Sequence, residues 1–404
     1  MLTYTFVARD PATGQQVTSE VQAENEKAAA KAIKQQGYAP LEISLLDSQN
    51  VLGGLLNRVK TKDKVIFSRQ MSTLINAGLP LVQSLHTVEE QTTSKAFKLI
   101  IQKVIADVEA GSAFSEALSR YPKVFNRVYC SLVEAGEASG TLDKALERLA
   151  NQQEKDAEIV SKVRGAMIYP LLVIVVMIAV VTFMIVTVLP HVQEIYKGIQ
   201  GAKLPFITVI LMDISNLIRH YWWVIIILLA TAIFFTTRWA RTGPGKEVVD
   251  KFKMRAWPIG KLFMKLYMAR FARTAETLVA SGVPLLQVMS ITSEAVNNVH
   301  ITRSIEEASE KVKGGKGLSE ALEGDPNFLD LVPKMVKVGE QSGQLETMLG
   351  KTADYYEREV DNEIRAVSTI IEPVLMIMLG VMALIIVAAV LLPIYGLANK
   401  LNVR

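Results

Sequence analysis

Several groups of ionisable residues have spacings that can support chemistry, but each also has a plainer structural interpretation. Glu154 and Glu158 lie one helical turn apart and can hold a divalent cation with a third carboxylate, although a solvated helix face is favoured. The segment "KGGKGL" at Lys313 resembles a phosphate-binding loop only in composition, because the required spacing and preceding strand are missing. The single Cys130 lies in an apolar helical pattern with no histidine nearby in sequence, which indicates a core thiol.

The sequence contains none of the motifs that mark common catalytic or nucleotide-binding sites. Its four histidines have no metal-ligand spacing, and there is no G-x-x-x-x-G-K-[ST] loop, no H-E-x-x-H and no nucleophile elbow. We therefore predict that the protein is not an enzyme and that it has no catalytic residues, metal site or cofactor.

The sharpest motif is G-E-x-S-G-x-L, which occurs as "GEASGTL" and again as "GEQSGQL". Its structural interpretation is a tight turn between two helices, in which a glycine supplies a permissive backbone and the serine bonds to nearby main chain. The residues assigned to these turns are Gly136, Ser139 and Gly140 in the first copy, and Gly339, Ser342 and Gly343 in the second.

The same motif also has a functional interpretation, which rests on its acidic residue. Glu137 and Glu340 are placed at a rigid turn and away from the core, so that they can form a contact point for a partner protein. The two interpretations remain open at this stage.

The motif belongs to a longer internal duplication. The segment "FSRQMSTLINAGLPLVQSLH" from Phe67 recurs 204 positions later as "FARTAETLVASGVPLLQVMS" from Phe271. Within it, a glycine suits a helix C-cap and a proline suits the first turn of the next helix. These predicted turns are Gly78 with Pro80 and Gly282 with Pro284. Because solenoid repeats are only about 20 to 50 residues long, two copies of this size indicate two homologous domains.

Each copy shows helical periodicity without strand signals, and we count about six helices per domain, which should form a compact antiparallel bundle. The correspondence between the two copies continues into an apolar stretch that follows each of them. Three segments with no Asp, Glu, Lys or Arg are long enough, or nearly so, to cross a hydrocarbon core of about 30 Å. We therefore predict three transmembrane helices. The prolines expected to mark membrane boundaries or hinges are Pro170, Pro190, Pro373 and Pro393.

Basic residues near the ends of the apolar segments predict the orientation. They are concentrated before the first segment, after the second and before the third, whereas the other side carries few. The positive-inside rule then places the N-terminus in the cytoplasm and the C-terminus on the periplasmic side. Because the net charge is only +4 and the basic excess follows the membrane edges, we assign it to topology and membrane lipids and not to nucleic acid.

The first 46 residues follow a different pattern, in which two alternating stretches, a helical stretch and a third strand form a ββαβ module. The predicted fold is therefore a mainly α membrane protein with two homologous cytoplasmic helical bundles and this small module. The expected domains are the module 1–46, a linker 47–62, the first bundle 63–164, transmembrane helix 165–190, a periplasmic loop 191–219 with an amphipathic helix lying on the membrane, transmembrane helix 220–238, the second bundle 239–370, transmembrane helix 371–396 and a tail 397–404.

Taken together, the F-x-R-x-x-x-T-L-x-x-x-G-x-P-L hairpins, the S-E-A-L and G-E-x-S-G-x-L motifs, the three spans and the N-terminal "YTFVARDPATG" resemble the type II secretion system F family. The resemblance covers nearly the whole chain. These are inner-membrane platform proteins of type IV pili (PilC type) or of type II secretion (GspF type).

The resemblance implies a non-enzymatic scaffold in the bacterial inner membrane. Its expected partners are a hexameric cytoplasmic secretion ATPase, pilins or pseudopilins, other inner-membrane assembly proteins and further copies of itself. The rival interpretations are a membrane adaptor or a transporter subunit unrelated to filaments. The absence of charged residues within the spans argues against an ion path and so disfavours the transporter.

Overall fold

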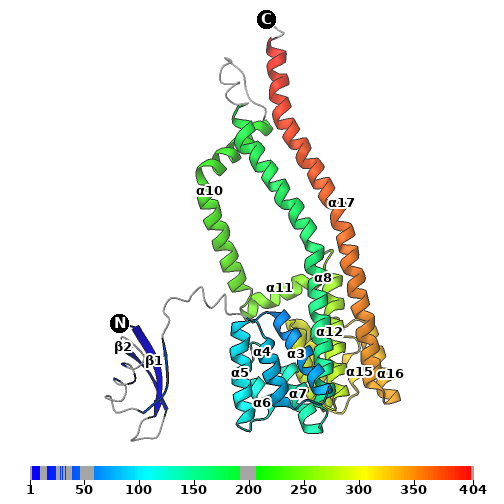
Figure 1. Cartoon of the computed structure of the whole chain (residues 1–404). Helices are drawn as coiled ribbons and strands as arrows, with labels where there is room; N and C mark the ends of the chain where they lie inside the picture. Colours follow the sequence, from blue (N-terminus) through cyan, green and yellow to red (C-terminus); the bar gives the residue numbers. More distant parts are fainter. Residues whose placement is uncertain are drawn as a thin grey trace.

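A computed structural model describes residues 2–9, 16–23, 39–45, 59–191 and 206–401, together with the single positions 28, 30 and 32. Helices dominate these residues. Two of the three longest helices carry the chain from a compact bundle into apolar segments (Figure 1).

The N-terminal residues form a three-stranded antiparallel sheet of β1 (Leu2–Arg9), β2 (Gln16–Ala23) and β3 (Ala39–Leu45), in the order β2-β1-β3. Phe6 of β1 lies opposite Ser19 on one side and Ile43 on the other. The helix predicted between the second and third strands lies mostly outside the described residues, so the complete ββαβ module stays a prediction. Most of the predicted linker 47–62 also lies outside them.

The first repeat contains six helices among the described residues, and the repeated sequence places six more at equivalent positions in the second. The first set is α3 (Thr61–Asn76), α4 (Leu81–Gln91), α5 (Lys95–Glu109), α6 (Phe114–Ser119), α7 (Arg127–Ser139) and α8 (Leu142–Phe183). The second set is α12 (Gly260–Ala280), α13 (Leu285–Val296), α14 (Val299–Lys313), α15 (Leu318–Leu322), α16 (Leu331–Ser342) and α17 (Leu345–Leu401).

Aromatic side chains occupy equivalent places in the two bundle cores. In the first repeat the ring of Phe67 lies 5.4 Å from that of Phe97 and 5.7 Å from that of Phe125. In the second repeat Phe271 and Phe328, the equivalents of Phe67 and Phe125, pack edge to face at 5.1 Å. The buried side chains of both repeats form one continuous apolar cluster, so the duplicated sequence folds into two bundles that share a core.

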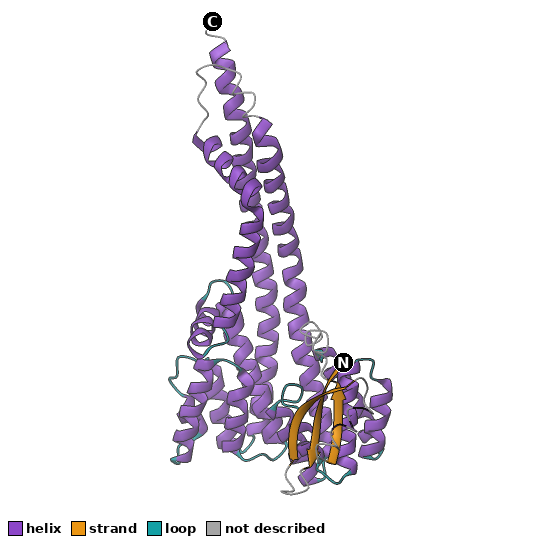
Figure 2. Ribbon diagram, turned by 90° about the vertical axis from the view of Figure 1, so that its left-hand side faces the viewer, coloured by secondary structure: helices purple, strands orange, loops and turns teal. Residues whose placement is uncertain are grey.

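Among the described residues, three helices are long and apolar enough to span a membrane, in the segments Leu142–His191, Val209–Trp239 and Leu345–Leu391. The first contains a short π-helix, η1 (Met184–Val188), directly after α8. Figure 1 shows α8 and α17 rising from the same end of the bundle, and in the side view of Figure 2 the long helices leave the bundle at one end. Pro170 lies inside α8, and Pro373 and Pro393 lie inside α17, so these prolines do not end a helix.

The second apolar helix, α10 (Phe206–Trp239), begins earlier than predicted. Residues 206–219 were expected in a periplasmic loop, but they are helical and continue into the apolar part across a kink at Tyr221. His191 is also helical, and the rest of the predicted loop, residues 192–205, lies outside the described ranges. The helical part agrees with the amphipathic helix expected there. Likewise, α17 continues to Leu401, into the predicted tail.

Between α10 and the second repeat lies α11 (Gly243–Arg255), which begins four residues after α10 ends. Figure 1 shows it running across the foot of α10, at the end of the bundle from which the long helices rise. It packs against α12 and α14. The interval 239–370 that was predicted as the second bundle thus begins with a helix that has no equivalent in the described part of the first repeat.

The first glycine of each G-E-x-S-G turn lies where two helices approach closely. A Cβ atom added at Gly136 would lie 2.6 Å from the Cβ of Ala145, and one at Gly339 would lie 2.9 Å from the Cα of Leu345. Real Cβ atoms do not approach so closely, so α7 can pack on α8, and α16 on α17, only because these positions lack a side chain.

We predict that Gly136→Ala and Gly339→Ala each destabilise the protein by roughly 1–3 kcal/mol, because the added methyl group forces apart two packed helices. Thermal unfolding of the purified full chain in detergent measures the effect. Gly165→Ala is the matched control, since no atom lies within 4 Å of a Cβ at that position in α8. Unfolding midpoints like that of the control would show that the close approach does not matter.

Candidate functional site

The two G-E-x-S-G segments form equivalent turns, one in each bundle. Gly140 has φ 70° and Gly343 has φ 68°, both in the left-handed region that favours glycine, and each ends the helix before the turn. The Ser139 hydroxyl donates to the carbonyl oxygen of Ala135, and the Ser342 hydroxyl donates to that of Val338, both at 2.7 Å. The repeated motif therefore directs the chain from a short helix into a long one at the same place in both bundles.

The turns of the opening hairpin are also equivalent. Gly78 and Gly282 have φ of 84° and 77°, and they follow the helices α3 and α12. Pro80 and Pro284 occupy the N-cap positions of α4 and α13. These four residues fix where the second helix of each bundle begins.

The glutamates of the turns bind backbone amides of their own bundles. The backbone N–H groups of Phe114 and Ser115 donate to the two oxygens of Glu137, at 2.6 and 2.9 Å. Glu340 accepts in the same way from Leu318 and Ser319, the latter at 3.1 Å. Each carboxylate thus caps the N-terminus of a short helix, α6 or α15, where free N–H groups and the helix dipole favour a negative charge.

Glu137 and Glu340 therefore have an internal role that sequence reasoning did not identify. The signal was present, because each "SEAL" segment, whose helix receives the cap, precedes a G-E pair at nearly constant spacing. The carboxylates are only partly covered in these contacts, and partner binding by them stays a prediction.

A second duplicated interaction joins the first and last helices of each bundle. Arg69 of α3 donates through Nε to Glu154 of α8 at 2.6 Å, and Arg273 of α12 donates through Nε to Glu357 of α17 at 2.8 Å. The arginines lie 204 residues apart and the glutamates 203 apart, as the duplication requires. The repeated hairpin motif contains this arginine, but nothing in the sequence pattern indicates its partner.

The two copies of this ion pair differ in their surroundings. The side chain of Arg273 is 17% exposed and that of Arg69 is 38% exposed. Arg273 also contacts Asp354, where the first repeat has the neutral Asn151. Burial lowers the pKa of Arg273, but its hydrogen bonds to Glu357 and Asp354 and the negative charges of Glu357 and Glu276 outweigh burial, so that the net pKa is raised. Arg273 therefore stays charged, and the second copy of the ion pair lies at a place that is better protected from solvent.

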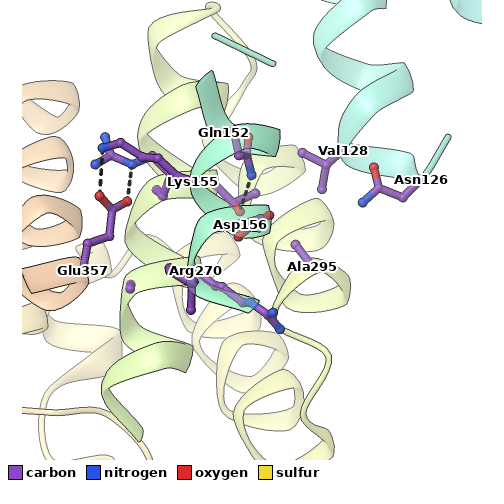
Figure 3. Close-up of a pocket in the computed structure, with 12 residues that line it drawn as sticks. Asn126, Val128, Gln152, Lys155, Asp156, Arg270, Ala295 and Glu357 are labelled. Atoms are coloured by element: carbon purple, nitrogen blue, oxygen red, sulfur yellow. Dashed lines mark hydrogen bonds and ion pairs between the residues drawn. The ribbon is translucent and has the colours of Figure 1, made fainter. Parts of the chain in front are cut away.

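This protected place is a charged seam between the repeats, which we define as the contact of α8 with α12 and α17. Lys155 donates to Glu357 at 2.8 Å, and Lys162 donates to Asp361 at 2.6 Å. Gln152 donates to the hydroxyl of Thr274 at 3.2 Å. Figure 3 shows Glu357 receiving hydrogen bonds at the edge of a pocket lined by both repeats.

Asp156 points into the same pocket from the charged part of α8, which precedes the apolar stretch (Figure 3). Burial raises the pKa of its carboxyl group, the positive charge of Arg270 opposes the shift, and the negative charge of Glu357 adds to it. Lys155 lies on the same turn of α8. The pocket thus concentrates charges of both signs between the repeats.

The acidic residues considered as cation ligands have basic partners. Glu154 is bonded to Arg69, and Glu158 lies 2.8 Å from Lys162. Within the described ranges no group of three or more His, Cys, Asp or Glu side chains is arranged to hold a metal ion. The seam can hold two bundles in register through paired charges, which is a mechanical role.

Comparison with known proteins gives matches over the whole chain. Residues 67–190 and 271–393 each match the family described as "Type II secretion system (T2SS), protein F", and residues 1–44 match "Type II secretion system protein F, N-terminal domain". The "Type IV pilus assembly protein PilC" of Thermus thermophilus is 38% identical over 100% of both chains. The "Type IV pilus assembly protein TapC" of Aeromonas hydrophila is 35% identical over 96% of this chain and 93% of the relative. The "Type II secretion system protein F" of Vibrio cholerae is 30% identical over 100% of both chains.

We predict that Arg273→Met destabilises the chain more than Arg69→Met does. Removing Arg273 leaves Glu357 and Asp354 short of a cation at the seam, which should cost roughly 1–3 kcal/mol. The more exposed Arg69 pair should contribute at most about 1 kcal/mol. Thermal unfolding midpoints of the two variants in the same detergent test this, with each serving as the matched control of the other. An equal loss would mean that the seam gives Arg273 no special role.

Proposed function

This chain belongs to the type II secretion system protein F family and is an inner-membrane protein, and we propose that it couples a cytoplasmic secretion ATPase to filament assembly as a platform. The filament subunits in this proposal are type IV pilins or pseudopilins. The protein itself carries out no catalysis and acts as a scaffold. Its other partners are inner-membrane assembly proteins and further copies of the chain.

One observation carries the proposal. Each of the two family matches covers a helical bundle together with most of the apolar helix that continues from it. A bundle and its membrane helix are therefore a single unit, present twice. Such a unit is suited to transmit a displacement from a soluble partner to the membrane, because α8 and α17 pass from one region to the other without a break.

The bundles offer surfaces for a partner protein. The sequence has no recognised nucleotide-binding loop. An external ATPase is therefore the energy source that fits a platform of this family. A membrane adaptor or a transporter subunit is the alternative. Co-purification of the full chain from its native membrane separates these, since a secretion-type ATPase and prepilins in the complex favour the platform, whereas an ABC-type ATPase favours the transporter.

We also propose that both bundles face the cytoplasm and that the C-terminus lies on the other side. Arg148, Lys155, Lys162 and Arg164 precede the first apolar stretch, and several more basic residues follow the second. Because basic residues near the ends of membrane spans are retained on the cytoplasmic side, their positions support this orientation.

We predict that the purified full chain binds its hexameric secretion ATPase without hydrolysing ATP. Glu137→Lys or Glu340→Lys should weaken this binding by roughly 1–3 kcal/mol if the carboxylate also contacts the partner. Because each glutamate caps a short helix, the unfolding midpoint is measured for each variant and binding is compared only where the variant is folded. Glu134→Lys, at an exposed position earlier on α7, is the control.

Two results would count against parts of this prediction. Unchanged binding by folded Glu137→Lys and Glu340→Lys would leave these glutamates with their capping role alone. If the full chain in detergent or in native membranes binds no secretion ATPase, the proposed coupling is wrong.

For the orientation, we predict that a cysteine at Gln200 reacts with a membrane-impermeant maleimide in intact cells, whereas a cysteine at the exposed Lys103 reacts only after permeabilisation. Both substitutions are made in a Cys130→Ser background, which removes the native thiol. The opposite labelling pattern would reverse the proposed orientation.

A further inference from the structure

The helix α11 places its polar contacts and its exposed side chains on opposite faces. Asp250 is buried and accepts from the backbone N–H of Val299 at 3.1 Å. Glu247 lies 3.6 Å from Arg303, and its carbonyl oxygen contacts the ring of His300. Both acidic residues of α11 are thus directed toward α14 of the second bundle.

The opposite side, which we call the α11 outer face, consists of Pro244, Val248, Lys251, Phe252 and Arg255. Val248 is 55% exposed and Phe252 is 68% exposed. Lys251 and Arg255 are exposed as well, and the acidic residues of α11 do not belong to this face. A helix whose exposed apolar side chains lie beside exposed cations such as Lys251 and Arg255 has the composition of a helix that lies on an anionic membrane surface.

The position of α11 relative to the spans is fixed by a close contact. A Cβ atom at Gly245 would lie 2.0 Å from the carbonyl oxygen of Trp239, the last residue of α10. Only glycine permits this approach, which sets α11 across the foot of the apolar helix (Figure 1). Since the bundle covers one face of α11, the outer face is turned away from the bundle at the level where the apolar helix α10 ends.

A pocket continues this surface where α11 passes into α12. It is lined by Arg255, Trp257 and Lys261 on one side, and by Glu363 and Ile370 of α17 on the other. Trp257 is 80% exposed. Glu363 is held by Lys265 at 2.7 Å. Arg255 and Lys261, which line the same pocket, have no carboxylate within ion-pair distance among the described residues. Ile370 directly precedes the predicted third span, so the pocket opens at the membrane edge.

We propose that the α11 outer face lies in the membrane surface and that Arg255 and Lys261 bind the headgroup phosphate of an anionic phospholipid. The occupant follows from three features together, namely exposed apolar side chains, unpaired cations and direct continuity with two apolar helices. Val248 and Phe252 enter the boundary of the acyl region, and Trp257 lies at headgroup depth. The inference depends on the membrane spans and not on the ATPase partner.

Site-directed spin labelling of the full chain in liposomes tests the position of the helix. A nitroxide is attached at Phe252→Cys in the Cys130→Ser background, and the matched control is Glu116→Cys in α6, which lies at the end of the bundle away from the spans (Figure 1). We expect the Phe252→Cys label to be relaxed more by oxygen than by a water-soluble nickel complex, and the control label to show the reverse. A Phe252→Cys label that behaves like the control, or that is shielded from both reagents, overturns the proposal.

Lipid retention tests the headgroup. The full chain is released from membranes of phosphatidylglycerol and phosphatidylcholine, and its bound lipids are counted by native mass spectrometry. We expect preferential retention of phosphatidylglycerol, and a loss of roughly threefold to tenfold in the Lys251→Gln/Arg255→Gln/Lys261→Gln variant. The matched control is Lys103→Gln/Lys123→Gln/Lys144→Gln, which removes the same charge from exposed positions of the first bundle. Equal retention of the two lipids by the native chain, or an equal effect of the two triple variants, overturns the proposal.

Discussion

The close approach of two helices at each G-E-x-S-G turn determines the direction in which the chain leaves a bundle. Gly136 lets α7 pack directly on α8, and Gly339 does the same for α16 and α17. The left-handed glycine at the end of each turn then reverses the chain. Because α8 and α17 have no break before they become apolar, the two turns also fix the direction of the membrane helices. The Glu137 and Glu340 caps join the neighbouring short helices to the same turns.

Duplication accounts for the two bundles, whereas divergence between the copies accounts for the seam that joins them. Arg69 and Arg273 make the same ion pair, but Asp354 replaces Asn151 beside the second. Arg270, which faces Asp156 at the seam, is replaced in the first copy by the exposed Ile66. Charged residues thus lie at a face where the two copies meet, and the equivalent face of the first copy differs.

The sequence was sufficient to predict the features that depend on local pattern. Helical periodicity, the glycines with positive φ and the apolar segments identified two bundles and three candidate spans, and the family was recognised from the repeated motifs. Contacts between residues that lie far apart in the sequence could not be predicted in this way. A carboxylate such as Glu137 looks exposed in a turn until the amides of Phe114 and Ser115 are placed beside it. The helical part before Tyr221 was expected only as a separate amphipathic helix, because Pro205 and Asp213 interrupt the apolar pattern, whereas the structure joins it to the apolar part of α10.

The composition of the seam indicates where this protein deforms most easily. Each bundle core contains side chains that are fully removed from solvent, such as Met71 and Val88, so a change within a bundle must break close packing. At the seam, Lys155 and Lys162 are about 40% exposed, and exposed ion pairs contribute only about 0–1 kcal/mol each. A small apolar cluster of Leu262, Val360 and Ile364 against α8 adds to the contact there, and elsewhere the two bundles share one continuous apolar core. A load applied to one bundle should therefore loosen the paired charges of the seam before it disturbs the close packing of the shared core.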